Sequence, residues 1–292
     1  MRNIDEQSVT DAFISHLSEC DSPRFKEILT SLVKHLHGFA REVRLTPDEW
    51  LNGIKFLTAT GQLRDETRQE FILLSDTLGL SMLVVTMNEK RAKKDVTEST
   101  VLGPFYVANA PERSPGSNIA EGSSGLPLEV NITVRSTDGH PLAGAEVNAW
   151  QADDDGLYDV QRSKAGEYRA RALMRTDASG RLNFHTVLPK AYPVPTDGPV
   201  GRMLMASGRH PWRPAHLHFM IRADGHETLV THLFREGDPF LDSDVVFGVR
   251  SGLVVKMQDA QGTGVLCHDF VLQSNKACHD GTSGAMLNKS AE

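Results

Sequence analysis

The spacing of apolar residues changes near residue 95, and this change constrains the fold more than any other feature of the chain. Before it, apolar residues recur with the period of an amphipathic α-helix. After residue 100, short runs that alternate apolar and polar residues are separated by turn signals such as Asp138-Gly139. Many short strands joined by turns favour a sandwich over an alternating α/β fold. We therefore predict a mainly β fold with α: a helical domain (residues 1–97), a β-sandwich domain (98–272) and a polar, flexible tail (273–292).

Both predicted domains can be divided into elements. Residues 46–49 predict a helix start, because Thr46 can cap the first turn and Glu49 completes a capping box. A further helix is expected from near Asp65, with a break at Gly79. An earlier helix is indicated by one apolar stripe: Phe25, Ile28, Leu29, Leu32, Val33, Leu36 and Phe39. The runs predicted as strands are 128–134, 145–150, 182–184, 216–221, 228–234 and 252–257.

Composition and charge exclude several classes of function. The chain has 292 residues and a formal net charge of −7, which argues against nucleic-acid binding because phosphate recognition needs clustered Lys and Arg. Acidic residues stand near the N-terminus where a signal peptide needs an apolar core, and residues 78–87 are too short for a membrane span, which takes about 20 apolar residues. Cys20, Cys267 and Cys278 lack CxxC spacing, which fits reduced thiols. We expect a cytoplasmic protein without membrane insertion.

Two histidines stand two residues apart in a predicted strand. Side chains at this spacing point to the same face, so His216 and His218 could supply half of the ligands of a metal ion. A zinc site, a cupin-type iron site and a chance pair all compete for this pattern. The cupin interpretation expects a glutamate soon after the pair, and the next one, Glu227, follows His218 only after nine positions.

The chain has four tyrosines, at 106, 158, 168 and 192. Tyr158 follows an acidic loop, and three prolines stiffen the backbone around Tyr192. Each of them taken alone is best interpreted as a core tyrosine. Together with the histidines, however, they resemble the intradiol ring-cleavage dioxygenases. The segments that carry the resemblance are GLY (156–158), PKAYP (189–193), RPAHLH (213–218) and LGPF (102–105).

This resemblance covers nearly the whole chain except the tail and implies a non-haem iron(III) enzyme that uses O2 to open catechols between the two hydroxyl-bearing carbons. It implies one Fe(III) per subunit, with Tyr158 and His216 as equatorial ligands and Tyr192 and His218 as axial ligands. Phenolates are hard anionic donors, which favour a ferric ion. The resemblance further implies that Tyr192 leaves the metal to take a substrate proton, and that Arg213 provides a fixed positive charge near the developing anion.

Two segments, 71–79 and 242–249, resemble the branch of the family that cleaves hydroxyquinol (benzene-1,2,4-triol) between C1 and C2 to 3-hydroxy-cis,cis-muconate or maleylacetate. Asp76 would accept a hydrogen bond from the third ring hydroxyl, and Val246 would leave room for it. The family has a glutamine on the strand after the histidine pair; this chain has His232 in that region, and we assign it no catalytic role. The implied substrate pocket comprises Leu73, Asp76, Val101, Leu102, Gly103, Pro104, Phe105, Val194, Pro195 and Val246.

Two alternatives stay open. Cleavage of catechol or chlorocatechol is one of them; the other is a non-catalytic, transthyretin-like binding module, which the turn-rich residues 130–150 would also suit.

The helices before residue 95 carry more apolar surface than so small a unit can bury, which predicts a homodimer through them. The resemblance also implies a phospholipid at that interface.

Overall fold

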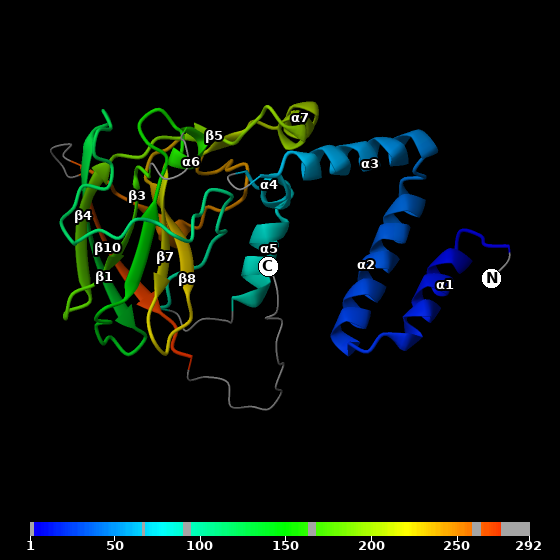
Figure 1. Cartoon of the computed structure of the whole chain (residues 1–292), viewed down its shortest axis with the longest axis horizontal. Helices are drawn as coiled ribbons and strands as arrows, with labels where there is room; N and C mark the ends of the chain where they lie inside the picture. Colours follow the sequence, from blue (N-terminus) through cyan, green and yellow to red (C-terminus); the bar gives the residue numbers. More distant parts are fainter. Residues whose placement is uncertain (1–2, 66–67, 90–94, 163–167, 259–263, 276–292) are drawn as a thin grey trace. The chain divides into compact units, whose positions relative to one another are not determined.

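The computed structural model describes residues 3–65, 68–89, 95–162, 168–258 and 264–275. Contacts divide the chain into two compact units, residues 1–59 and 60–292, and Figure 1 shows the order of their elements. Cys20 and Cys267 are free thiols, whereas Cys278 and most of the predicted tail lie outside the described residues. Within these ranges no single helix is long and apolar enough to cross a membrane. The helices Glu70–Thr77 and Leu80–Asn88 reach the necessary length and apolarity only when they are taken together, and a bend of 73° separates them.

The first unit is helical. It contains α1 (Ser8–His16), η1 (Leu17–Glu19), α2 (Pro23–Glu42) and the first part of α3 (Pro47–Gln62). The predicted capping box at the start of α3 is confirmed: the Glu49 amide donates to Thr46 Oγ1 at 3.3 Å, and the Thr46 amide donates to Glu49 Oε2 at 2.9 Å. Five of the seven residues of the predicted stripe are exposed on α2, namely Phe25, Ile28, Leu32, Leu36 and Phe39, and Leu29 and Val33 are half-buried.

The second unit contains the predicted sandwich of two sheets. One sheet has the order β10-β1-β4, with β1 (Pro127–Ser136) paired in parallel with β10 (Val265–Leu272) and antiparallel to β4 (Arg181–Val187). The other has the order β3-β2-β7-β8-β9. Its strands are β3 (Arg171–Arg175), β2 (Glu146–Trp150), β7 (His216–Arg222), β8 (Leu229–Arg235) and β9 (Val254–Val255).

The core lies between these two sheets. Side chains of β7 alternate between two environments, because successive residues of a strand point to opposite faces. Leu217, Phe219 and Ile221 belong to the main core, together with residues of the other sheet such as Val130 and Phe270. His216 and His218 therefore point away from this core, to the other face of their sheet.

Short elements cover that other face. They are α4 (Glu70–Thr77), α5 (Leu80–Asn88), α6 (Asp159–Arg162), β5 (Tyr192–Pro193), α7 (Pro199–Ala206) and β6 (Trp212–Arg213), whereas Leu253 of η2 (Ser251–Leu253) belongs to the main core. Helix α4 contacts both α5 and α7. The predicted break at Gly79 is confirmed, since this residue has a φ of 76° between α4 and α5.

Two predicted boundaries are wrong for local reasons. The helix expected from Asp65 begins only at Glu70, because the Asp65 carboxylate accepts from the Arg68 amide at 2.7 Å and forms a turn instead. The strand expected over residues 252–257 is reduced to Val254–Val255, because the chain enters it through the 3₁₀ turn Ser251–Leu253. Helix α7 and strand β10 were not predicted from the sequence pattern.

Candidate metal centre and substrate pocket

The two histidines of β7 and the two tyrosines meet on the covered face of the larger sheet. Tyr192 lies on β5, which pairs with β6 so that Tyr192 is opposite Arg213. Tyr158 follows a tight turn at Gly156, whose φ is 81° and where an added Cβ would lie 3.2 Å from that of Tyr192. All four side chains are almost fully buried.

The four side chains that were predicted as ligands converge. Tyr158 Oη lies 2.9 Å from His218 Nε2, 3.5 Å from His216 Nε2 and 3.3 Å from Tyr192 Oη. The two Nε2 atoms are 3.1 Å apart. Ligand atoms bound about 2.1 Å from one ion lie about 3.0 to 3.4 Å from each other. The spacing therefore fits a single metal ion.

Contacts on the far side of each ring turn the two Nε2 atoms toward the tyrosines. His216 Nδ1 lies 2.7 Å from the Pro214 carbonyl, which can only accept, so Nδ1 carries the proton. His218 Nδ1 lies 2.7 Å from His232 Nε2, and His232 Nδ1 lies 2.7 Å from Thr100 Oγ1. Such contacts fix the tautomer and orientation of a ligating histidine.

The sequence analysis named His232 but gave it no catalytic role. It groups with His216 and His218 as three possible ligands within 4.8 Å, but its Nε2 faces the far nitrogen of His218. Cross-strand register explains the contact, because β8 places His232 directly opposite His218. We therefore assign His232 to orienting His218.

The electrostatics of the two phenols call for a strong cation. Burial raises the pKa of Tyr158 well above its ordinary value of 10.0, and the neighbouring Tyr192 raises it further. Burial also raises the pKa of Tyr192, while the charge of Arg213 opposes the rise. These phenols stay neutral unless a metal of high charge ionises them. Two phenol oxygens with two imidazole nitrogens fit a non-haem iron site.

The buried histidines predict a loss of stability in acid. Burial lowers the pKa of His216, His218 and His232 well below 6.5. Below about pH 6.5 these histidines bind protons in the unfolded chain but not in the folded chain. The free energy of unfolding is therefore highest above pH 6.5 and falls as the pH drops below it. The shifts of the three histidines act in the same direction, so their contributions to this loss of stability add. Denaturant unfolding of the iron-free protein between pH 7 and 5 measures the slope; a stability that does not change over this range would contradict the assignment.

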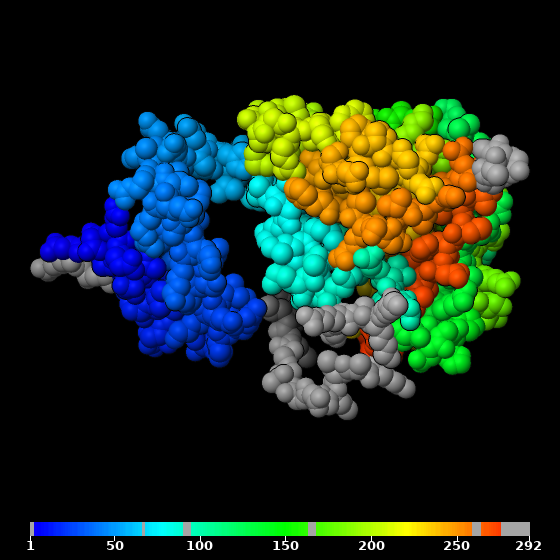
Figure 2. Space-filling model, turned by 180° about the vertical axis from the view of Figure 1, so that it is seen from behind, coloured from blue at the N-terminus to red at the C-terminus, as the bar shows by residue number. Residues whose placement is uncertain are grey.

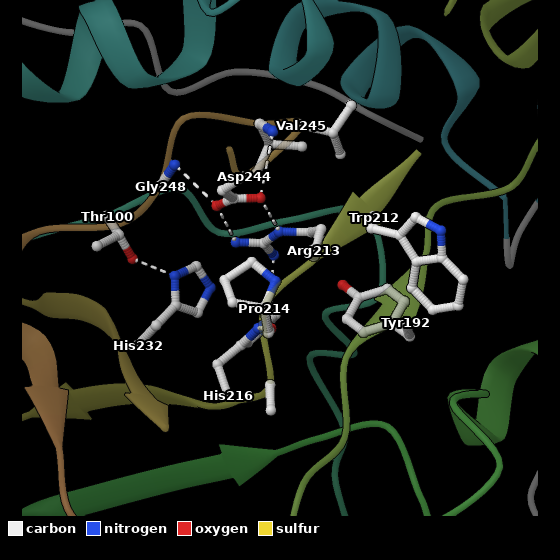
Figure 3. A network of polar contacts seen from close by, with 12 residues as sticks. Thr100, Tyr192, Trp212, Arg213, Pro214, His216, His232, Asp244, Val245 and Gly248 are labelled. Atoms are coloured by element: carbon white, nitrogen blue, oxygen red, sulfur yellow. Dashed lines mark hydrogen bonds and ion pairs between the residues drawn. The ribbon is translucent and has the colours of Figure 1, made fainter. Parts of the chain in front are cut away.

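Arg213 is held beside the ligands by a buried ion pair. Its Nε and Nη2 donate to the Asp244 carboxylate at 3.1 and 3.2 Å, and both side chains are 2% exposed. Nη1 of Arg213 lies 3.2 Å from His216 Nε2 (Figure 3). Asp244 also accepts from the amides of Val246 and Gly248. The guanidinium is therefore a fixed positive charge at the ligand cluster.

A second buried ion pair supports Tyr158. Arg171 donates to Asp159, next to Tyr158, at 2.7 and 3.0 Å, and also to the Phe105 carbonyl at 2.9 Å. The Phe105 ring in turn stacks on Tyr158 with centroids 4.5 Å apart. On the other side of the cluster, Trp150 stacks on His218 at 4.6 Å. The sequence interpretation assigned no role to Trp150, Asp159 or Arg171.

The predicted pocket residues do not all lie in one place. Leu73, Pro104, Phe105, Val194 and Pro195 line one cavity of about 500 Å³ beside the tyrosines. Asp76 and Val246 are buried near Arg213 and Asp244, whose charges act on the Asp76 carboxyl. Gly103 approaches the His218 ring, and Val101 is buried. Leu102 packs against the aromatic cluster of the tyrosines but lines a separate cavity of about 380 Å³.

The fold and this cluster define a β-sandwich protein with a buried set of side chains that fits a non-haem metal site. Residues 101–274 match the family model described as Dioxygenase, and residues 22–95 match Catechol dioxygenase N terminus. The chain belongs to the intradiol ring-cleavage dioxygenase family.

Relatives within this family are similar over most of their length. The 6-chlorohydroxyquinol 1,2-dioxygenase of Cupriavidus pinatubonensis is 54% identical over 93% of this chain and 99% of its own. The hydroxyquinol 1,2-dioxygenase of Rhodococcus opacus is 50% identical over 85% of this chain and 83% of its own. The solved hydroxyquinol 1,2-dioxygenase of Pseudomonas putida DLL-E4 has a TM-score of 0.82 at 45% identity, over 92% of this chain and 99% of that one.

Proposed function

We propose that this protein is a hydroxyquinol 1,2-dioxygenase, which inserts both atoms of O2 into hydroxyquinol with cleavage between C1 and C2 and forms 3-hydroxy-cis,cis-muconate or its tautomer maleylacetate. The observation that carries the proposal is that one phenol oxygen, Tyr158 Oη, lies within 3.5 Å of a second phenol oxygen and of two imidazole nitrogens, in a family whose similar members act on this triol.

The proposed ligands of one Fe(III) per subunit are Tyr158, Tyr192, His216 and His218. When bound, such an ion would hold the substrate oxygens and draw charge from the ring. Tyr192 would be a phenolate while it holds the ion, and on release its oxygen can take up one substrate proton, because burial raises its pKa and makes the neutral phenol the favoured form. The fixed charge of Arg213 favours the anion that develops on the substrate.

Asp76 is the residue that we propose to recognise the third ring hydroxyl. Its side chain is 1% exposed, and its Oδ1 has no hydrogen-bond partner. A buried acceptor left without a donor costs free energy. A hydroxyl of the bound triol would supply that donor, whereas catechol has none at that position.

Oxygen uptake with hydroxyquinol and with catechol, with the product identified, tests the proposed function. We expect a clear preference for the triol in the wild type. Asp76→Ala should lower kcat/KM for hydroxyquinol roughly 10- to 100-fold and change catechol turnover less. Equal losses on both substrates would reject the role of Asp76, and a wild type that prefers catechol would make it a catechol 1,2-dioxygenase.

A second copy of the chain is proposed to cover the exposed stripe of α2. Five large apolar side chains are exposed along one face of α2, which is the kind of apolar surface that marks an interface. We also propose that a phospholipid binds at that interface. We further propose a cytoplasmic location, which the free thiols of Cys20 and Cys267 support.

Sedimentation at micromolar concentration tests the dimer. We expect a dimer for the wild type and a monomer for Leu32→Lys/Leu36→Lys, because each substitution places a charge in the apolar patch. Lys34→Ala, outside the stripe on the same helix, is the matched control and should stay dimeric. Lipid extraction with mass spectrometry tests the ligand, and a monomeric wild type would contradict the interface.

A further inference from the structure

Arg209 connects two segments that each carry a residue of the proposed hydroxyl-recognition site. Its Nη1 donates to the Thr77 carbonyl at the end of α4 at 2.6 Å, and its Nη2 donates to the Val245 carbonyl at 2.8 Å. Asp76 directly precedes Thr77, and Val246 directly follows Val245. One planar guanidinium therefore fixes the distance between the backbone that carries Asp76 and the backbone that carries Val246.

The backbone of Arg209 is itself fixed by the end of α7. Gly208 adopts a φ of 70°, and the Arg209 amide donates to the Leu204 carbonyl at 3.0 Å, which closes the helix end. Figure 2 shows that α7 in yellow-green, the segment after β8 in orange and the α4–α5 region in cyan meet on one face. Arg209, whose backbone is fixed at the end of α7, therefore contacts the end of α4 and the segment after β8.

Phe247 shows that the connected loop is under strain. This residue has a φ of 60°, which is rare for a bulky side chain. The Arg209 guanidinium lies 5.0 Å from the centre of its ring, and the ring packs over Gly79, where an added Cβ would be 3.2 Å away. The loop is anchored independently of Arg209, because Asp244 binds Arg213 and the Val245 amide donates to the Trp212 carbonyl. Loss of Arg209 would therefore remove the contact to the Thr77 carbonyl of α4, while the loop that carries Val246 stays folded.

We propose that Arg209 is a specificity-determining positioning residue: it holds Asp76 and Val246 at the separation that accepts a third ring hydroxyl, without touching the substrate itself. The inference rests on the proposed function, because it concerns discrimination between hydroxyquinol and catechol.

The test compares Arg209→Ala and Arg209→Lys with the wild type in the iron-loaded enzyme, measuring kcat and KM for both substrates. For Arg209→Ala we expect the ratio of kcat/KM for hydroxyquinol to that for catechol to fall about tenfold, mainly through KM for the triol. A lysine cannot bridge both carbonyls with a planar fork, so Arg209→Lys should show an intermediate ratio. Added guanidinium at a non-denaturing concentration should restore part of the ratio in Arg209→Ala. The matched control is Arg181→Ala, which removes an exposed arginine from β4 in the other sheet.

Iron content and thermal unfolding of each variant separate positioning from a general structural role. An unchanged ratio in a folded, iron-loaded Arg209→Ala would overturn the inference while the proposed function stands. Equal losses on both substrates, or loss of iron, would also overturn it. If Arg209→Ala fails to fold, Arg209→Lys decides, and a wild-type ratio in that variant overturns the inference. A wild type without preference for hydroxyquinol would overturn the proposed function and the inference together.

Discussion

A Tyr158→Phe variant is expected to bind iron at least about 100-fold more weakly than the wild type and to lose its activity. The substitution removes one oxygen from the centre of the cluster, where Tyr158 Oη lies within 3.5 Å of three other donor atoms. Loss of a residue that only supports a metal ligand already costs about 10- to 100-fold in affinity or activity. Loss of an anionic ligand should cost more, because its charge offsets that of the ion.

Iron content after dialysis and the visible absorption of the phenolate complex measure this effect. Tyr168→Phe is the matched control, since it removes the same atom from a tyrosine that is 37% exposed. The control should keep its iron and its colour. A Tyr158→Phe variant that keeps wild-type iron and activity would show that the four side chains do not share one ion.

Arg213→Ala is expected to lower both the rate and the stability. Removing a preorganised charge from a water-excluded site costs about 10²- to 10³-fold in kcat. The substitution also leaves the buried Asp244 carboxylate without its cation, and breaking a buried ion pair costs about 3 to 5 kcal/mol. Stopped-flow kinetics and denaturant unfolding measure the two effects separately.

The double variant Arg213→Ala/Asp244→Ala separates these contributions. Stability should return in part, because no charge is then buried alone, and the two single effects should not add. The rate should stay low, because the missing cation is not replaced. Recovery of the rate together with stability would mean that Arg213 acts only through folding.

Local sequence patterns predicted the parts of the site that depend on one element. The spacing of His216 and His218 places both on one strand face whatever the rest of the chain does, and the capping box at Thr46 and Glu49 closes within four residues. The sandwich followed from the alternation of short runs. The tyrosines were different, because only their resemblance to a known family, and no local pattern, associated them with the histidines.

Local sequence patterns did not predict the contacts between segments that are distant in the chain. Asp244 meets Arg213 across 31 positions, and the intervening chain gives no signal of the pairing. The assignment of His232 needed the register of β7 against β8, which a one-residue shift would change completely. The buried pair of Arg171 and Asp159 similarly depends on where β3 lies beside the loop after Tyr158.

The pairing of His218 opposite His232 also decides how the site can assemble. A slip by one residue between β7 and β8 would turn His232 toward the core and leave Nδ1 of His218 without its contact to His232. The alignment of these two strands therefore decides whether the His218 ring keeps the orientation that turns its Nε2 toward Tyr158.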